Sequence, residues 1–314
     1  MTSYVGRNER QREMVKLFNK LCYRYSRYEV WQDMVVMIAC AIANAVDKRH
    51  FEKREEMYMR VVKKYDKDVL KVFPEFFTHI VMGMEEYPDC DFLGELYMDL
   101  DLGNSHAGQF FTPYDVCRLM AQVTINGDLL KSQIEKHGWI SINDCACGAG
   151  ATLVAAANYL RSIGINYQMQ ALFIAQDLDA TVALMCYIQL SLLGCAGYVK
   201  IGNTLTEPMT GNVLFGDEQE STWYTPMYFH ATWNTRRAIA MTESVFRAVA
   251  TPFTGVTAKP TADNMPDAEL SGNAIGELES RPVPESKNIY TPALTISTGK
   301  KNAGQIMFDF GGTL

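Results

Sequence analysis

The sequence predicts an α/β protein in which a doubly wound, mostly parallel sheet follows an all-helical N-terminal region. Three apolar runs each end in an acidic or amide side chain, at Asp144, Asp177 and Asn203. Stretches with helical apolar spacing separate these runs, and this alternation is typical of a parallel sheet with crossover helices. From Asn8 to about Tyr87, by contrast, apolar residues recur at three- and four-residue steps.

Composition and charge are those of an ordinary globular chain. It has 314 residues, of which 48% are apolar and 21% charged, and its formal net charge is −7. This charge weighs only mildly against a nucleic-acid partner, because a local basic patch can bind phosphates on an acidic protein. The eight cysteines lie mostly inside apolar patterns, as in reduced cytoplasmic proteins. Cys145 and Cys147 lack a second Cys/His pair at zinc-site spacing, so no metal site is expected.

No signal peptide or membrane span is predicted. The first residues are polar and charged where a signal peptide would need an apolar segment. The most apolar stretch, residues 34–46, is too short to cross a bilayer and reads as a buried helix. We therefore expect a cytoplasmic protein with no membrane partner.

The N-terminal region, residues 1–90, is predicted to be helical, with Pro74 and Pro88 marking its end. Its first part carries an excess of basic side chains, namely Arg7, Arg10, Arg12, Lys16, Lys20, Arg24 and Arg27. Such a helix can lie along the phosphates of a nucleic acid, or it can simply be a solvated helix face. The sequence leaves both interpretations open.

A short amphipathic helix is predicted next, over residues 91–102, followed by a loop that ends at Pro113. Thr112 and Pro113 predict the start of another helix, because threonine can cap a helix and proline suits its first turn. One face of that helix is apolar and carries Val116, Leu119, Met120 and Val123.

The stretch from Trp139 to Leu153 reads as a strand, a glycine turn and a helix. Gly148 and Gly150 let a ligand approach the backbone, and the helix that follows points unpaired N–H groups toward it. The carboxylate of Asp144 suits a ligand with an ammonium group, which favours S-adenosylmethionine over a dinucleotide. A plain strand-to-helix turn that happens to contain two glycines is the alternative.

The rest of the sheet and the C-terminal part follow from the same patterns. Strands are expected at 168–174 and 199–205, with helices at 180–193 and 231–249. Parallel strands bind ligands at their carboxyl edge, where the acidic and amide residues would meet. The predicted division is a helical region (1–90), a sheet domain (91–250) and an irregular tail (251–314). Within the tail, extended loops or partial disorder are expected at 251–287, and terminal strands at 290–297 and 305–310.

Four separated segments together resemble the S-adenosylmethionine-dependent N6-adenine DNA methyltransferases, above all the modification subunits of type I restriction systems. These segments are G-Q-F-F-T-P at 108–113, D-C-A-C-G-A-G at 144–150, Q-D-L-D at 176–179 and G-N-T-L at 202–205. The resemblance implies a Rossmann-like methyltransferase sheet and S-adenosylmethionine as cofactor. It also implies DNA as substrate and a specificity or restriction subunit as partner.

The resemblance implies a role for individual residues around the cofactor. Phe110, Thr112 and Pro113 would line its methionine end. Asp177 would accept hydrogen bonds from the ribose hydroxyls, and Asn203 would lie near the adenine ring, where an amide can both donate and accept.

The glycine turn would cradle the amino acid portion of the cofactor through Asp144, Gly148 and Gly150. Cys145 stands where the family usually has proline. A cysteine is compact, so the turn should keep its shape.

The sequence departs from the family at the site for the methyl acceptor. These enzymes carry a [DNS]-P-P-[YFW] loop after the fourth strand, which binds and stacks on a flipped-out adenine. This chain has no such tetrapeptide, and the nearest candidate is T-P-M-Y at 225–228. There the Thr225 hydroxyl, the Pro226 carbonyl and the Tyr228 ring would be the catalytic groups. Alternatively, residues 223–229 form an aromatic loop that only closes the sheet edge.

Two functional hypotheses follow. The chain is an adenine-N6 DNA methyltransferase, or it is a catalytically silent relative that binds S-adenosylmethionine and acts as a DNA- or partner-binding module on a mobile element. The segment at 108–113 argues against a methyltransferase for other substrates. A nicotinamide-dependent oxidoreductase would need a third glycine where Leu153 stands. Sequence-specific reading of DNA is expected to come from the N-terminal helices or from another subunit.

Overall fold

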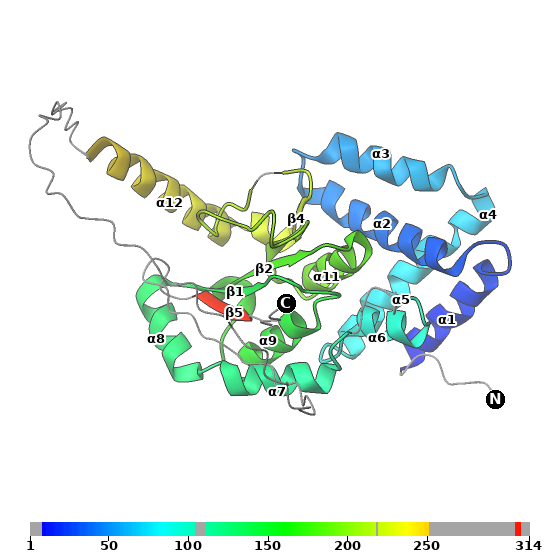
Figure 1. The fold of residues 1–314 in the computed structure, drawn as a ribbon, viewed down its shortest axis with the longest axis horizontal. Helices are drawn as coiled ribbons and strands as arrows, with labels where there is room; N and C mark the ends of the chain where they lie inside the picture. Colours follow the sequence, from blue (N-terminus) through cyan, green and yellow to red (C-terminus); the bar gives the residue numbers. More distant parts are fainter. Residues whose placement is uncertain (1–7, 104–110, 218, 251–304, 309–314) are drawn as a thin grey trace, which may run out of the picture.

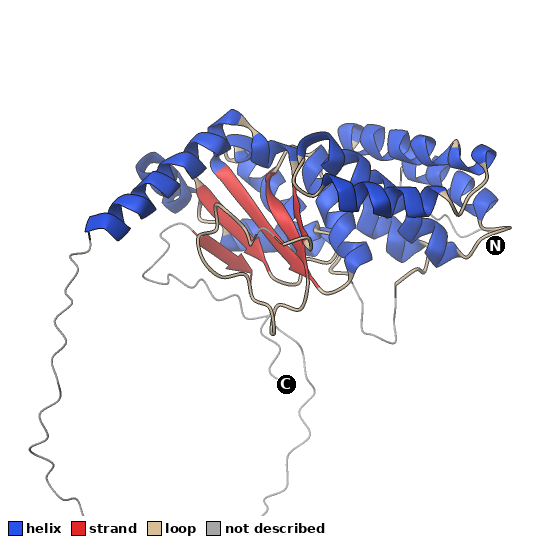
Figure 2. Ribbon diagram, turned by 90° about the horizontal axis from the view of Figure 1, so that it is seen from above, coloured by secondary structure: helices blue, strands red, loops and turns tan. Residues whose placement is uncertain are grey.

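The structure is a computed structural model that describes residues 8–103, 111–217, 219–250 and 305–308. A five-stranded sheet in the order β4-β3-β2-β1-β5 occupies the centre, and helices from the first part of the chain lie beside it (Figures 1 and 2). The strands are β1 (Ile140–Asp144), β2 (Ala171–Asp177), β3 (Ala196–Ile201), β4 (Thr222–Tyr224) and β5 (Gln305–Phe308). This arrangement confirms the predicted fold class.

Four of the five strands run parallel, and β4 alone runs antiparallel to its neighbour β3. In the register of the sheet, Asp144 pairs with Ala175 and Asp177 pairs with Ile201. The carboxyl ends of β1, β2 and β3 therefore meet at one edge, which is where such sheets bind ligands.

Both faces of the sheet are buried, because alternate side chains of β2 enter two different cores. Phe173 and Ala175 belong to the large core, which includes α9 and α11, whereas Leu172 and Ile174 face a smaller core closed by η2 and α12. The elements of this half are α7 (Tyr114–Thr124), α8 (Gly127–His137), α9 (Ala151–Ser162), α10 (Tyr167–Gln170), α11 (Ala180–Leu192), the 3-10 helix η2 (Pro226–Phe229) and α12 (Ala231–Ala250).

The N-terminal part is helical, as predicted, and it packs on the sheet domain through α2. Its elements are α1 (Glu9–Leu21), α2 (Arg27–Val46), α3 (Phe51–Val62), α4 (Lys67–Leu70), α5 (Val72–Glu86) and α6 (Phe92–Asp99). The buried ring of Trp31 lies 6.0 Å from that of Phe18, and its indole N–H donates to the Met185 sulfur of α11 at 3.4 Å. One hydrophobic core thus continues across the predicted boundary at residue 90, which falls in the loop between α5 and α6.

Helix α2 is long and apolar enough to cross a membrane by length and composition alone. However, 56% of its most apolar window is buried inside the fold. Met34, Val35 and Ala39 have almost no exposed surface, which matches the predicted buried helix.

A buried ion pair fastens the helical part to the edge strand β4. Arg54 of α3 pairs with Asp47 at 2.6 Å and donates to the Thr222 carbonyl at 3.0 Å, and its guanidinium lies 4.4 Å from the Trp223 ring centroid. Arg54 and Asp47 are 2% and 3% exposed. Burial alone would raise the pKa of Asp47, but the hydrogen bonds from His50 and Arg54 outweigh it and lower the pKa. The carboxylate therefore stays ionised.

Some predicted boundaries differ from the structure. The third strand begins at Ala196, whereas the apolar pattern placed its start at 199. The reason is Gly197, which carries no apolar side chain and lies so close to β2 that a Cβ there would come within 1.8 Å of the Phe173 carbonyl oxygen. In the tail, β5 occupies Gln305–Phe308 of the predicted 305–310 strand, and the predicted strand at 290–297 lies outside the described residues.

Candidate functional site

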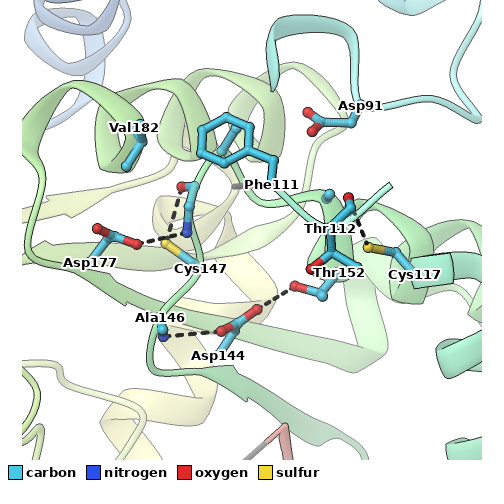
Figure 3. A pocket seen from close by; sticks show the side chains of 13 residues that line it. Asp91, Phe111, Thr112, Cys117, Asp144, Ala146, Cys147, Thr152, Asp177 and Val182 are labelled. Atoms are coloured by element: carbon cyan, nitrogen blue, oxygen red, sulfur yellow. Dashed lines mark hydrogen bonds between the residues drawn. The ribbon is translucent and has the colours of Figure 1, made fainter. Parts of the chain in front are cut away.

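A cavity of about 240 Å³ opens at the carboxyl ends of β1 and β2 (Figure 3). Its walls come from the glycine turn, the end of β2, the first turn of α11 and the segment before α7. The described residues that line it are Asp91, Phe111, Thr112, Cys117, Asp144, Ala146, Cys147, Gly148, Ala149, Ala151, Thr152, Asp177 and Val182. Segments far apart in the sequence thus converge where the sequence placed a ligand site.

The glycine turn has the backbone shape that its sequence predicts. Gly148 and Gly150 both have positive φ, of 51° and 94°, which other residues rarely adopt. Gly150 is the N-cap residue of α9, and no side chain among the described residues caps that helix. A Cβ on Gly150 would lie 2.7 Å from the Cys186 sulfur, so the turn packs tightly on α11. The first N–H groups of α9 are therefore available to a ligand carboxylate.

Asp177 connects the end of β2 to this turn. Its Oδ2 accepts from the Gly148 N–H at 2.8 Å, and its Oδ1 accepts from the Asp179 N–H at 3.0 Å. Burial is the largest influence on this carboxyl and raises its pKa, while the backbone hydrogen bonds act in the opposite direction. Each oxygen retains a further lone pair, so the carboxylate can accept two more hydrogen bonds from a ligand.

Asp144 is the second carboxyl of the cavity, and unlike the half-buried Asp177 it is buried. Its Oδ1 accepts from the Ala146 N–H at 3.1 Å, and the Thr152 hydroxyl donates to its Oδ2. Burial, together with a smaller effect of the nearby Asp177 charge, raises its pKa to about 6, although the hydrogen bonds from Thr152 and Ala146 lower it. Near neutral pH the Asp144 side chain is therefore mostly ionised, although its surroundings disfavour the negative charge. A cationic ligand group beside it would stabilise that charge.

Asp144→Asn should make the ligand-free protein more stable at pH 7. The carboxyl has an ordinary pKa of 3.8 and a folded pKa of about 6, so the folded state binds its proton more tightly than the unfolded state. Stability from this group therefore falls as pH rises from about 4 to above 6, by about 3 kcal/mol in total. Removing the charge should recover much of that loss at pH 7 and little near pH 4.

Urea denaturation at both pH values measures this difference. Asp68→Asn, which changes a side chain that is 92% exposed, is the control for removing one negative charge. Equal stability of the Asp144→Asn variant and the unchanged protein at pH 7 would contradict the proposed charge burial.

A hydrogen-bond chain joins the wall formed by α6 and α11 to the glycine turn. Asp91, the N-cap of α6, accepts from the Gly94 N–H at 3.0 Å and from Gln189 Nε2 at 2.7 Å. The same Nε2 donates to the Ala149 carbonyl at 2.8 Å, so α6 and α11 are fixed to the turn. Phe111 completes this wall and stacks on Tyr97, with ring centroids 5.6 Å apart.

The structure brings four of the predicted cofactor residues together, namely Thr112, Asp144, Gly148 and Asp177. Gly150 and Pro113 stand just behind them as the N-cap residues of α9 and α7. The Cys145 carbonyl accepts from the Thr204 hydroxyl at 2.6 Å and so joins the turn to the loop after β3.

Two predicted residues are not placed in the cavity wall. Asn203 lies in the loop after β3, where its side chain accepts from the Leu205 N–H at 2.9 Å. Phe110 lies outside the described residues. Its neighbour Phe111 lines the cavity.

Sequence reasoning also missed Asp91, Cys117, Cys147, Thr152 and Val182. For the polar residues among them, no sequence motif distinguishes a residue that contacts a ligand from one that caps a helix. Only the meeting of α6, α7, α9 and α11 at one edge identifies them.

The predicted acceptor segment lies away from this cavity. Thr225 has no exposed surface; its hydroxyl donates to the Cys195 carbonyl at 2.7 Å and accepts from the Gly197 N–H at 3.0 Å. Because β4 is antiparallel, the chain after it returns to the amino end of β3. Pro226 begins η2 there, and the Tyr228 hydroxyl donates to the Leu214 carbonyl at 2.8 Å. These positions conflict with a catalytic role and agree with the alternative that this loop closes the sheet edge.

The basic side chains of the N-terminal helices are largely engaged within the fold. Arg10 pairs with Glu86 at 2.6 Å, Lys16 with Glu13 at 2.6 Å and Arg24 with Asp66 at 3.4 Å. Arg27 donates to Asn19 Oδ1 at 3.0 Å and to the Leu100 carbonyl at 3.3 Å. This pairing favours the interpretation of a solvated helix face. Among the described residues, no cluster of His, Cys, Asp and Glu could hold a metal ion.

The family model of the N-6 DNA Methylase family matches residues 92–258. One similar solved structure is a Listeria monocytogenes protein assigned to the class I S-adenosylmethionine-dependent methyltransferases, with 17% identity, a TM-score of 0.35, and coverage of 66% of this chain and 58% of that chain. Another is the type I restriction-modification system methyltransferase subunit from Streptococcus thermophilus, with 15% identity, a TM-score of 0.33, and coverage of 65% and 60%.

The chain thus spans about three-fifths of the length of these two solved structures. No curated protein matches it.

Proposed function

This chain belongs to the N-6 DNA methylase family, and on that premise we propose that it is an S-adenosylmethionine-dependent DNA methyltransferase that acts on N6 of adenine. The observation that carries the proposal is the pair of carboxyls, the buried Asp144 and the half-buried Asp177, on either side of an uncapped helix N-terminus in one cavity. S-adenosylmethionine has an ammonium group and ribose hydroxyls, which need hydrogen-bond acceptors, and a carboxylate, which needs N–H donors. Few cofactors need all three.

The residues present fit the parts of S-adenosylmethionine. Asp177 would accept from the ribose hydroxyls, because both of its oxygens keep a lone pair beyond their backbone hydrogen bonds. The N–H groups at the start of α9 would bind the carboxylate of the amino acid portion. Asp144 would balance its ammonium group, and Phe111 and Thr112 would lie against its methionine end.

When bound, S-adenosylmethionine would supply an electrophilic methyl group. The N6 nitrogen of adenine would form the new C–N bond as the C–S bond breaks, and the nitrogen would then release a proton to solvent. The chain itself would mainly hold the cofactor in one orientation and exclude water from the cavity, since alignment supplies much of the rate in such transfers.

The adenine that accepts the methyl group must reach the carboxyl edge of the sheet. Phe308, the last residue of β5, pairs with Asp144, so the carboxyl end of β5 lies beside that of β1. The carboxyl ends of β1 and β5 thus supply the acceptor side of the site in this proposal, in place of the segment at 225–228.

Isothermal titration of the full chain with S-adenosylmethionine tests the cofactor half of the proposal. Saturable binding is expected, and its absence would reject the proposal as a whole. Transfer of a tritiated methyl group to DNA, followed by identification of N6-methyladenine in the digested product, tests the acceptor half. Binding without transfer to any DNA would mean that the chain keeps the cofactor site but needs a partner subunit or lacks the activity. Adding a candidate specificity subunit distinguishes these two cases.

A further inference from the structure

A second and larger cavity, of about 400 Å³, lies beyond the edge strand β4 and shares no lining residue with the cofactor cavity. Residues from three parts of the chain line it. Figure 1 labels the elements to which they belong or which they adjoin, α2, α3, β4 and α12. The three parts are the corner between α2 and α3, the aromatic segment of β4 and η2, and one face of α12. Nothing in the proposed methyl transfer uses this cavity.

Aromatic rings form its inner wall. The hydroxyls of Tyr224 and Tyr228 donate to the Phe215 and Leu214 carbonyls at 3.1 and 2.8 Å, so the wall is fastened to the loop before β4. Tyr224 and Tyr228 are each 5% exposed, whereas Phe215 and Phe229 are only half-buried. These two rings therefore present an apolar surface to the cavity on a support that is already ordered.

Cationic side chains form the rest of the lining. Arg237 of α12 lies over the Tyr228 ring, 3.8 Å from its centroid, and its Nη2 donates to the Tyr228 carbonyl at 2.8 Å. Its Nη1 is buried and has no hydrogen-bond partner among the described residues. Lys48 and Arg49 are exposed at the corner between α2 and α3.

Among the described lining residues, no carboxylate is left to balance the positive charges of Lys48 and Arg237. Asp47 is the one carboxylate among its described lining residues, and it already pairs with Arg54 at 2.6 Å and with His50 at 2.8 Å. The cavity thus combines aromatic surface, net positive charge and a buried guanidinium N–H without a partner, on a protein whose overall charge is −7.

We infer that this cavity binds a nucleotide, with the phosphate at Arg237 and Lys48 and the base against Phe215 and Phe229. An inorganic anion would not use the aromatic wall, and a neutral aromatic ligand would leave the Nη1 of Arg237 without an acceptor. Planar bases stack on aromatic side chains, and guanidinium groups bind phosphate oxygens through pairs of N–H groups. The ligand is either a free nucleotide or a nucleotide within a single strand, since both present this chemistry.

Titration of the full chain with thymidine 5′-monophosphate and with a fluorescein-labelled, single-stranded oligothymidylate tests the inference. Neither probe contains adenine, so neither is a substrate of the proposed methyl transfer. Saturable binding of at least one probe is expected, with thymidine and inorganic phosphate at least about tenfold weaker than the monophosphate or the strand. A free-nucleotide site binds the monophosphate as tightly as the strand, whereas a strand site prefers the oligonucleotide.

Arg237→Met and Lys48→Gln should each weaken binding by about tenfold or more, because each removes a charged phosphate contact. Arg236→Met is the matched control on the same helix. Arg236 donates to the Met169 and Gly138 carbonyls at 2.6 and 2.8 Å and does not line the cavity. Lys48 is exposed, so its variant tests the site even if Arg237→Met unfolds the chain.

Three results would overturn the inference: no binding of either probe, equal losses in the Arg236 and Arg237 variants, or displacement of the oligonucleotide by poly-glutamate at equal charge concentration. The last result would show a site for anionic peptide. The Asp177→Asn variant alters the cofactor cavity. Probe binding that persists in this variant would show that the nucleotide site does not depend on the cofactor site.

Discussion

Asp177→Asn should weaken S-adenosylmethionine binding by about a hundredfold or more. The carboxylate would accept from two ribose hydroxyls while it holds the Gly148 N–H at 2.8 Å and the Asp179 N–H at 3.0 Å. Hydrogen bonds to a charged group contribute about 1.5–3 kcal/mol each, so the loss of two is enough for this change. An asparagine would also point an N–H group at a backbone donor, which disturbs the turn. Isothermal titration measures the affinity directly.

Asp179→Asn is the matched control, because it removes the same charge two residues along the chain. Asp179 caps α11 by accepting from the Thr181 N–H at 2.8 Å, and asparagine caps helices about as well as aspartate. Its variant should bind the cofactor within about threefold of the unchanged protein, since a helix cap alone makes no ligand contact. Equal losses in both variants would show that binding depends on local charge and would contradict the assigned role of Asp177.

Arg54→Met should cause the largest loss of stability of any single change considered, about 3–5 kcal/mol in the free energy of unfolding. The substitution leaves the Asp47 carboxylate buried without the partner that holds it at 2.6 Å. It also removes the contact of α3 with the Thr222 carbonyl and with the Trp223 ring. Urea denaturation followed by circular dichroism measures the change.

Arg60→Met provides the control within the same helix. Arg60 and Glu56 are 72% and 74% exposed and lie 3.6 Å apart, so their pair should contribute less than about 1 kcal/mol. Adding Asp47→Asn to the Arg54 variant should restore part of its stability, because the uncompensated charge is then gone. A small effect of Arg54→Met would mean that water reaches Asp47 and that the helical part is not fastened to β4 in this way.

The glycine turn could be predicted because its chemistry is local. Gly148 and Gly150 have positive φ and Asp144 ends β1, as the sequence indicated. The position of the 225–228 segment could not be predicted in this way. Its Thr-Pro-Met-Tyr sequence is compatible with either end of the sheet, and the direction of β4 decides between them.

The sequence by itself determined the α/β class, the helical N-terminal region, the turn from Asp144 to Gly150 and the acid at Asp177. These features follow from apolar spacing and backbone preference, which neighbouring residues dictate. Only the tertiary structure decided which side chains share a cavity. It brought Asp91 and Phe111 to the glycine turn and placed Thr225 at the amino end of β3, away from the cavity. Pairing between distant segments sets such positions, because strand direction and helix packing depend on contacts that no local pattern records.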